Sequence, residues 1–405
     1  MTETNHEAGK NPAAGKKLAP ATRLIHAGRA PTRSYGLVNP PLYRGSTVLQ
    51  PDMKSRTSTG RKWREQALVY GVYGNPTHFA LEDLVAEIEG GTRAQIVSSG
   101  VAACTTALLA VLGAGDHCLM PDSVYYPTRS FCDTMLKRFG VETTYYAPTA
   151  PKAEIAALMR PNTRAIFAES PGSHTFEVQD VPMLARVAHQ NGAKLLLDNT
   201  WGLGFFAPFE HGVDFSIQAL TKYAGGHSDL LLGAITTNSD ENFDLLRSAV
   251  LQLGQYASPD DCWLALRGAR TLHVRLEHQM QAGLTVARWF QSRPEVARVL
   301  HPALPEDPGH ALWARDFTGA CSLFGVEFLP IYRKQSINDF ADALQLFGLG
   351  ASWGGYESLV LPTEAVRTAS HPLDGPGCRF HIGLEAVEDL IADLEQAIGK
   401  LRPQG

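Results

Sequence analysis

The stretch AQIVSSGVAACTTALLAVLGAGDHCLMP, residues 94–121, changes its pattern twice within a short distance. Residues 94–99 form a short apolar run that ends in serines, which predicts a strand. Residues 100–115 are rich in Ala and Leu and end in glycines, which is typical of a helix and its C-terminal stop. Residues 117–121 are again a short, mostly apolar run. A strand, a helix and a strand joined this closely predict a βαβ unit with parallel strands.

The same alternation continues to about residue 237. The strand runs are almost continuously apolar, which is typical of a parallel sheet that helices cover on both faces. A helix predicted at 78–91 precedes the first strand, and the later elements are expected as strands at 141–147, 164–170, 193–199, 213–220 and 230–237, with helices at 127–140, 153–159 and 181–192. The predicted fold class is α/β with a mostly parallel sheet.

The regions on either side of this alternation differ from it. Residues 20–75 are irregular and rich in proline, which predicts an arm that wraps another surface. After about residue 265 a long helical stretch precedes strands at 322–329 and 378–384 and an amphipathic final helix. We therefore expect an N-terminal arm at 1–70 with a disordered tail at 1–18, an α/β domain at 71–265, and a smaller α+β domain at 266–405.

Composition argues against several classes of function. Lys and Arg number 36 against 41 Asp and Glu, and this net charge of −5 gives no electrostatic case for binding nucleic acid or an anionic membrane. We expect neither a signal peptide nor a membrane-spanning segment, because no apolar run is long enough. The six cysteines form no CxxC pair, so no metal site is indicated and a reducing, cytoplasmic compartment is favoured.

Two candidate ligand-binding features follow predicted strands, at the sheet edge where ligands of such folds collect. In SSGVAACTT the backbone amides of Gly100, Val101 and Ala102 begin a helix and can bind an anion. An ordinary strand-to-helix turn gives the same pattern. Asp198 ends the apolar run KLLLD, where a carboxylate needs a cationic partner or hydrogen-bond donors. A capping role is the alternative for Asp198.

Two further residues occupy similar positions. Tyr125 comes shortly after the strand HCLMP and can stack on a flat ligand, although a packing tyrosine is the simpler interpretation. Lys222 follows the apolar run FSIQAL, where partial burial lowers the pKa of an amine and frees its lone pair. A surface lysine after a strand is the alternative. Together the four features match pyridoxal 5′-phosphate, which has a phosphate, a basic ring nitrogen, a flat ring and an aldehyde.

Several motifs in the same order along the chain resemble the Cys/Met-metabolism enzymes that use pyridoxal phosphate. The resemblance covers roughly residues 20–401 and implies an aspartate-aminotransferase-like large domain of fold type I. It rests on YGVYGNPTHFALE (70–82), GDHCLMPDSVYYPTRSFC (115–132), ESPGS (169–173), LLLDNTWGLG (195–204), SIQALTKYAGGHSD (216–229), HPALP (301–305), RDFTGACSLF (315–324), SWGGYES (352–358) and RFHIGLE (379–385).

The resemblance implies a role for each matched residue. Lys222 would form the Schiff base and move protons, with Tyr125 stacking on the ring and assisting, and Asp198 would pair with the ring nitrogen. The remaining residues divide into those that would bind the phosphate and those that would contact the substrate: Gly100, Val101 and Thr221 for the phosphate, Arg379 for the substrate carboxylate, Ser352 and Trp353 for the substrate-lining turn, and Tyr70 for the site of a neighbouring subunit. A homodimer with shared sites, assembling further into a homotetramer, is therefore expected.

The implied reaction is β-elimination of L-cystathionine and other cysteine S-conjugates to a thiol, pyruvate and ammonia, in methionine biosynthesis. Ala219, where the family usually has serine, is similar to the β-acting members. Two positions depart from the family pattern. Val72 stands where an arginine usually contacts the partner's phosphate, so either Arg61, Lys62 or Arg64 substitutes or cofactor affinity relies on the remaining donors. Ala351 replaces a tyrosine at the substrate mouth.

Three other functions compete with this one. The first is a γ-lyase, γ-synthase or cysteine desulfhydrase of the same family. The second is a regulatory protein that binds the cofactor with little turnover, and the absence of the usual arginine at Val72 supports this alternative. The third, a nicotinamide-dependent oxidoreductase, is disfavoured because no GxGxxG follows the first strand.

Overall fold

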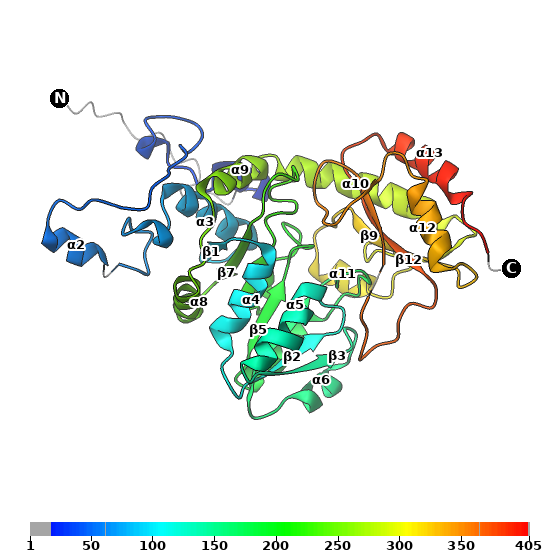
Figure 1. Cartoon of the computed structure of the whole chain (residues 1–405), viewed down its shortest axis with the longest axis horizontal. Coiled ribbons are helices and arrows are strands. Elements are labelled where there is room, and N and C mark those ends of the chain that lie inside the picture. The colour runs from blue at the N-terminus through cyan, green and yellow to red at the C-terminus, as the bar shows by residue number, and fades with distance from the viewer. Residues whose placement is uncertain (1–17, 61, 364, 404–405) are drawn as a thin grey trace.

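The computed structural model describes residues 18–60, 62–363 and 365–403. The predicted disordered tail at 1–18 lies outside the described residues except for Leu18. Two sheets organise the chain, and the helix α10 (Leu272–Gln291) runs between the regions that they occupy (Figure 1).

The first sheet has seven strands in the order β1-β7-β6-β5-β4-β2-β3. Strand β7 is antiparallel to both of its neighbours, β1 and β6, whereas the other neighbouring pairs are parallel. The strands are β1 (Arg93–Val97), β2 (His117–Pro121), β3 (Glu142–Tyr146), β4 (Thr163–Glu169), β5 (Lys194–Asp198), β6 (Phe215–Gln218) and β7 (Gly233–Thr237). The predicted α/β fold with a mostly parallel sheet is confirmed.

Helices cover both faces of this sheet, as the apolar strands require. In β5, Leu196 packs in a cluster with α4 residues, whereas its neighbours Leu195 and Leu197 pack in the cluster that contains α3 and α7. Successive strand residues point to opposite faces of the sheet, so a strand that is apolar at every position needs helices packed on both faces. The helices of this region are α3 (Pro76–Glu89), α4 (Gly100–Val111), α5 (Tyr126–Phe131), α6 (Lys152–Leu158), α7 (Val181–Gln190), α8 (Asp240–Gln252) and α9 (Pro259–Ala269).

Local signals place α4 where the anion-binding prediction needs it. Ser99 has extended backbone angles and its hydroxyl accepts a hydrogen bond from the amide of Ala102 at 3.0 Å, so it caps the helix. The helix starts three residues after β1 ends. It stops at Val111, earlier than predicted, because Leu112 returns to extended backbone angles before two glycines.

The second sheet has the order β10-β11-β12-β9-β8 and covers a separate apolar cluster. Phe324 of β9 and Phe380 of β12 lie face to face in this core with ring centroids 5.8 Å apart, and Phe290 of α10 packs against both. The elements are β8 (Val296–Leu300), α11 (His310–Asp316), β9 (Leu323–Phe328), α12 (Lys334–Asp342), β10 (Gly348–Leu349), β11 (Leu359–Pro362), β12 (Gly377–His381) and α13 (Val387–Ile398).

The residues before α3 form an extended arm with two short helices, α1 (Pro20–His26) and α2 (Met53–Gly60), and α2 projects away from the rest of the chain (Figure 1). Many apolar side chains of the arm are exposed: Tyr35, Leu37, Val38, Leu42, Tyr43, Leu49, Met53, Leu68 and Tyr70. Isolated exposed apolar residues are normal, but this density along one segment fits a surface that contacts another chain. The division into an arm and two domains stays a prediction, and its boundary at residue 265 falls inside α9.

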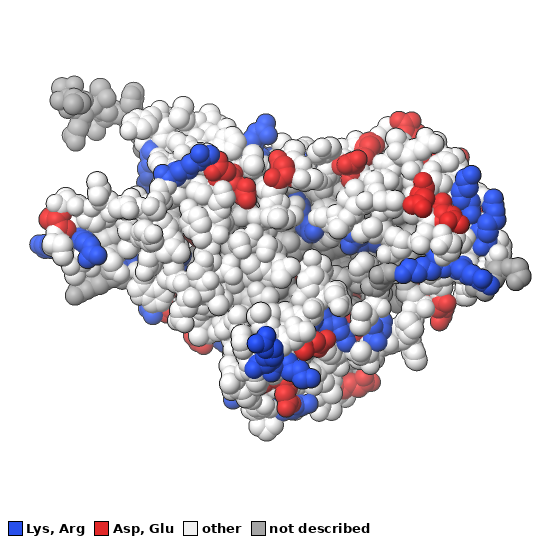
Figure 2. Space-filling view, in the orientation of Figure 1, with Lys and Arg blue, Asp and Glu red and all other residues white. Residues whose placement is uncertain are grey.

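The charged surface is mixed. Acidic and basic side chains are interspersed on the face in Figure 2, without one continuous basic field. No helix among the described residues has the length and apolar character needed to cross a bilayer.

Candidate active site

The carboxyl ends of the parallel strands carry two carboxylates, of which Glu169 is buried and Asp198 is half-buried. Glu169 ends β4 and Asp198 ends β5, and the two residues are register neighbours across the strand pair. Sequence analysis identified Asp198 and missed Glu169, although Glu169 is the first residue of the quoted motif ESPGS.

The carboxylate of Asp198 is held on both sides. One oxygen, Oδ1, accepts hydrogen bonds from the backbone amide of Thr200 at 3.0 Å and from its hydroxyl at 2.6 Å. The other, Oδ2, accepts from the Cys104 thiol at 3.7 Å. Burial raises the pKa of Asp198 above its usual value, and the Thr200 hydrogen bonds oppose that shift. A fixed, poorly solvated carboxylate of this kind favours a cationic partner such as a protonated ring nitrogen.

Lys222 lies four residues after β6, and its amine donates a hydrogen bond to the Ser352 hydroxyl at 2.6 Å. The same amine lies 5.4 Å from the centre of the Trp353 ring. Burial lowers the pKa of Lys222 to about 8, with the charge of Arg379 acting in the same direction. The predicted partial burial is therefore present, and a larger fraction of this amine is neutral near neutral pH than of an exposed lysine.

The turn that carries Ser352 and Trp353 is seated directly on the lysine backbone. Ser352 has a positive φ of 82°, and Gly354 has a φ of +84°. A Cβ at Gly354 would lie 2.8 Å from the Tyr223 nitrogen and 2.9 Å from the Lys222 carbonyl carbon. Glycine is therefore required both by the backbone angle and by the close approach.

Arg379 brings the second sheet into the site. It lies on β12, and its guanidinium donates to the Ser352 carbonyl at 3.0 Å. Burial lowers the pKa of Arg379 to about 10, while the electrostatic influence of Tyr125 raises it. The lysine, the arginine and the substrate-lining turn predicted from separate motifs thus converge in the structure.

Tyr125 stands at the start of α5 with its position fixed through Glu169. Its backbone amide donates to Glu169 Oε2 at 2.6 Å, and the Ser173 hydroxyl donates to Oε1 at 2.5 Å. Tyr125 remains 41% exposed, which leaves surface that a flat ligand could cover. Burial, followed by the charge of Asp198, raises the pKa of Glu169 to about 8.

The predicted phosphate-binding region lies where the start of α4 packs closely against the loop after β6. A Cβ at Gly100 would lie 2.7 Å from the Ala219 Cβ, so the start of α4 and the loop after β6 meet closely. The start of α4 carries the amides of Gly100 and Val101, whereas the Ala102 amide, also predicted to bind the anion, donates to the Ser99 hydroxyl. Thr221 differs from the expectation, because its hydroxyl donates to the Leu232 carbonyl at 3.1 Å and accepts from the Leu232 amide at 3.0 Å. That hydroxyl is therefore already engaged by backbone.

Tyr70 lies on the arm, apart from this convergence, and is 50% exposed. Of the basic residues considered as replacements near Val72, Lys62 pairs with Glu65 at 3.5 Å and Arg64 pairs with Asp244 at 2.8 Å. Arg61 lies outside the described residues.

The residues present fit pyridoxal phosphate. An amine with a lowered pKa, a fixed, half-buried carboxylate, a partly exposed tyrosine and the amides at the start of α4 supply a partner for each group of that cofactor. The Cys104 thiol beside Asp198 adds a weak donor that leaves the carboxylate available to a cation.

Comparisons with known proteins agree with this fit. The family described as "Cys/Met metabolism PLP-dependent enzyme" matches residues 21–399. A protein named putative cystathionine beta-lyase from Rhizobium johnstonii is 46% identical over 93% of this chain and 94% of its own length. The cystathionine beta-lyase of Bordetella avium is 44% identical over 94% and 97%. The crystal structure of metB from Corynebacterium glutamicum matches with a TM-score of 0.87 and 32% identity over 95% of this chain and 98% of that chain.

Proposed function

Because this chain belongs to the Cys/Met metabolism PLP-dependent enzyme family, we propose that it catalyses β-elimination of L-cystathionine to L-homocysteine, pyruvate and ammonia. The chain is a carbon–sulfur lyase that uses pyridoxal phosphate; the β-specific reaction is the proposed part. The names of the Rhizobium and Bordetella relatives support it. The reaction would supply homocysteine for methionine biosynthesis in the cytoplasm.

The proposal depends most on one observation. The Lys222 amine contacts Ser352 at 2.6 Å, and the Arg379 guanidinium contacts the same residue at 3.0 Å. A base and a carboxylate-binding group this close together can hold an amino acid by its carboxylate and reach its Cα proton.

Each residue then has a defined task. When bound, pyridoxal phosphate withdraws electrons from the substrate Cα, which acidifies its proton. Arg379 binds the α-carboxylate through two parallel hydrogen bonds and orients the Cα–H bond toward Lys222. The neutral amine of Lys222 takes that proton. Asp198 remains ionised and keeps a proton on the ring nitrogen.

The bond that breaks is the one between Cβ and sulfur. The sulfur leaves with the bonding electron pair and accepts a proton from Lys222, with Tyr125 as the second candidate donor, to give the thiol. The remaining three-carbon fragment hydrolyses to pyruvate and ammonia. Ser352 accepts a hydrogen bond from the Lys222 amine and holds it on the reacting side of the site.

The proposal includes a homodimer with shared sites, assembling further into a homotetramer, in which Tyr70 contacts the cofactor and substrate bound by a second copy. The exposed apolar arm and the half-exposed Tyr70 ring support such a contact. We also propose that cystine and other cysteine S-conjugates are substrates, because the small, exposed side chain of Ala351 leaves the substrate mouth open.

Incubation of the purified enzyme with cystathionine, cystine and methionine in parallel tests this proposal, with each keto acid identified by mass spectrometry. Cystathionine is expected to give pyruvate, and 2-oxobutyrate would instead identify γ-elimination. Lys222→Ala should abolish both the turnover and the visible absorbance band of the bound cofactor. A wild-type protein that shows the band but forms no keto acid would identify a cofactor-binding protein without turnover.

A further inference from the structure

A buried arginine on the surface helix α8 joins the arm to the first sheet. Arg247 is 4% exposed and makes three hydrogen bonds with its guanidinium. Nε donates to the Trp63 carbonyl at 3.0 Å, Nη2 donates to the Tyr73 carbonyl at 2.9 Å, and Nη1 donates to Gln95 Oε1 at 2.5 Å. One side chain thus binds two backbone carbonyls of the arm. Because both acceptors are backbone atoms, no side chain of the arm takes part in these two contacts.

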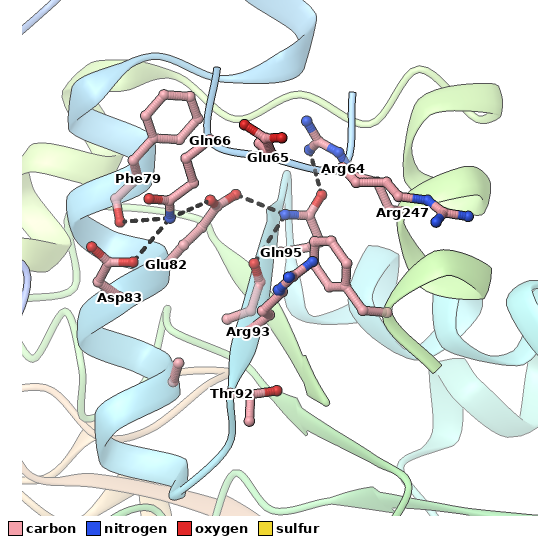
Figure 3. Close-up of a pocket in the computed structure, with 13 residues that line it drawn as sticks. Arg64, Glu65, Gln66, Phe79, Glu82, Asp83, Thr92, Arg93, Gln95 and Arg247 are labelled. Atoms are coloured by element: carbon pink, nitrogen blue, oxygen red, sulfur yellow. Dashed lines mark hydrogen bonds between the residues drawn. The ribbon is translucent and has the colours of Figure 1, made fainter. Parts of the chain in front are cut away.

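The guanidinium belongs to a polar cluster that lines a cavity of about 280 Å³ between the arm, α3 and β1 (Figure 3). Gln95 donates to Glu82 at 2.9 Å, and Gln66 of the arm donates to the other Glu82 oxygen at 3.3 Å and to Asp83 at 2.9 Å. Burial raises the pKa of Glu82 to about 8, and the charge of Arg247 opposes that shift. A chain of hydrogen bonds therefore connects the arm to the sheet through residues that all have partners.

The two bound carbonyls flank Tyr70. Trp63 precedes Tyr70 in the chain and Tyr73 follows it. The backbone between them is further fixed by an isolated antiparallel β-bridge between Tyr70 and Thr47. The Tyr70 ring nevertheless points outward, since half of the residue is exposed. A segment held at both ends with an exposed aromatic residue between them is organised to present that residue to something outside the chain.

We propose that Arg247 is a positioning residue for the active site of a second copy of this chain. It fixes segment 63–73 so that Tyr70 projects at a defined place and angle. The inference rests on the shared-site part of the proposed function. It assigns to Arg247 an effect on the partner's site, not on the site of its own subunit.

The same cavity contains an arginine that serves as a matched control. Arg93 pairs with Asp240 at 3.4 Å, and its guanidinium lies over the Phe243 ring at 4.8 Å. Both partners belong to α8, so the contacts of Arg93 connect the sheet to that helix without involving the arm. Its replacement changes the charge of the cavity equally but leaves the Trp63 and Tyr73 carbonyls bound.

Arg247→Met removes all three donors while keeping much of the buried volume, and Arg247→Lys keeps the charge but can satisfy fewer of the acceptors. Unpaired carbonyls at both ends should loosen the arm. Trypsin cleavage of the cofactor-free proteins measures this directly, because the arm offers Lys54, Arg56 and Lys62 as cleavage sites. We expect cleavage at these sites to be faster in Arg247→Met than in wild type or Arg93→Met, with Arg247→Lys intermediate.

Subunit mixing distinguishes a partner effect from a general structural one. Arg247→Met subunits retain Lys222 and supply a loosened arm, whereas Lys222→Ala subunits lack the amine and supply an intact arm. In a mixed dimer, the Arg247→Met subunit contributes a site that contains Lys222, and the Lys222→Ala subunit contributes the intact arm that completes this site. Half of randomly assembled dimers are mixed and one of their two sites is native, so about a quarter of wild-type activity should return. Tyr70→Phe mixed with Lys222→Ala should behave in the same way, and Tyr70→Phe mixed with Arg247→Met should not recover.

The mixing and cleavage experiments can each support or overturn a positioning role for Arg247. Recovery with Lys222→Ala, together with faster arm cleavage, supports the proposal. Failure to recover although mixed dimers are confirmed by mass spectrometry would show that Arg247 acts within its own subunit and would overturn it. Unchanged arm cleavage in both Arg247 variants would also overturn it, and this result does not depend on which substrate the enzyme uses. If Arg247→Met does not fold, Arg247→Lys carries the same comparisons with smaller expected effects.

Discussion

Substitution of Gly354 by alanine tests whether the substrate-lining turn is seated on the catalytic lysine. The new Cβ would lie 2.8 Å from the Tyr223 nitrogen, so the turn has to retreat by about 0.6 Å to reach ordinary van der Waals contact. The positive φ of Gly354 costs roughly 1–2 kcal/mol for alanine, and the overpacking adds roughly 1–3 kcal/mol. Because Ser352 and Trp353 move with the turn, kcat/KM should fall by about tenfold or more.

The matched control is Gly192→Ala. Gly192 has a φ of +70° but no atom within 4 Å of the position of a Cβ, so it has the same backbone strain without the contact. Thermal midpoints measured at one scan rate should fall in both variants and further in Gly354→Ala. Turnover of cystathionine should fall in Gly354→Ala and remain near wild type in Gly192→Ala. Equal turnover in the two variants would refute the reasoning, since it would mean that the turn does not depend on the Lys222 backbone.

Three other substitutions follow from the site. Asp198→Asn removes the charge that holds the ring proton and should lower kcat by about 10²–10³-fold, which steady-state kinetics will measure; a kcat within a few-fold of wild type would contradict it. Arg379→Lys keeps the charge that lowers the pKa of Lys222 but loses the two-point contact, so KM should rise by about 30-fold, from a loss of about 2 kcal/mol, and kcat should also fall because the Cα–H bond is held less well toward Lys222; a KM equal to that of wild type would refute this. Glu169 has a folded pKa of about 8, above its usual value, so its contribution to stability is lost as pH rises through 8. The thermal midpoint of the cofactor-free Glu169→Gln variant should decline less than that of wild type between pH 6 and pH 9, and parallel curves would argue against the assignment.

The strands of the first sheet could be predicted because their burial on both faces leaves an almost unbroken apolar run, as in β5 and β6. The helix α8 was not predicted, although Phe243, Leu246 and Val250 recur at helical spacing and lie buried. Strands β8 and β10 gave weaker signals, because β8 begins with exposed residues and β10 has two residues. Short edge strands depend on neighbours that are distant in the sequence.

Some residues of the site could likewise be predicted from the sequence, and others could not. Lys222 and Asp198 could be identified because a charged residue at or shortly after the end of an apolar strand is conspicuous in a sequence. Glu169 has the same local context, but its importance comes from its register beside Asp198 and its hydrogen bond to Tyr125, which the sequence does not display. The Thr221 hydroxyl was expected at the phosphate, and its bonds to Leu232 exist because strand β7 returns antiparallel beside β6.

The charges around Lys222 explain why a partly buried lysine is tolerated there. Burial and the neighbouring Arg379 both favour the neutral amine, and Asp198 alone favours the charged form. Glu169 is mostly protonated at neutral pH, because its pKa is about 8, so it adds little negative charge beside Asp198. A cationic ring nitrogen would then meet Asp198, and an anionic substrate carboxylate would meet Arg379. Because the pKa of Lys222 is lowered to about 8, part of the amine is neutral near that pH, which is the state that a base requires before it can take a proton.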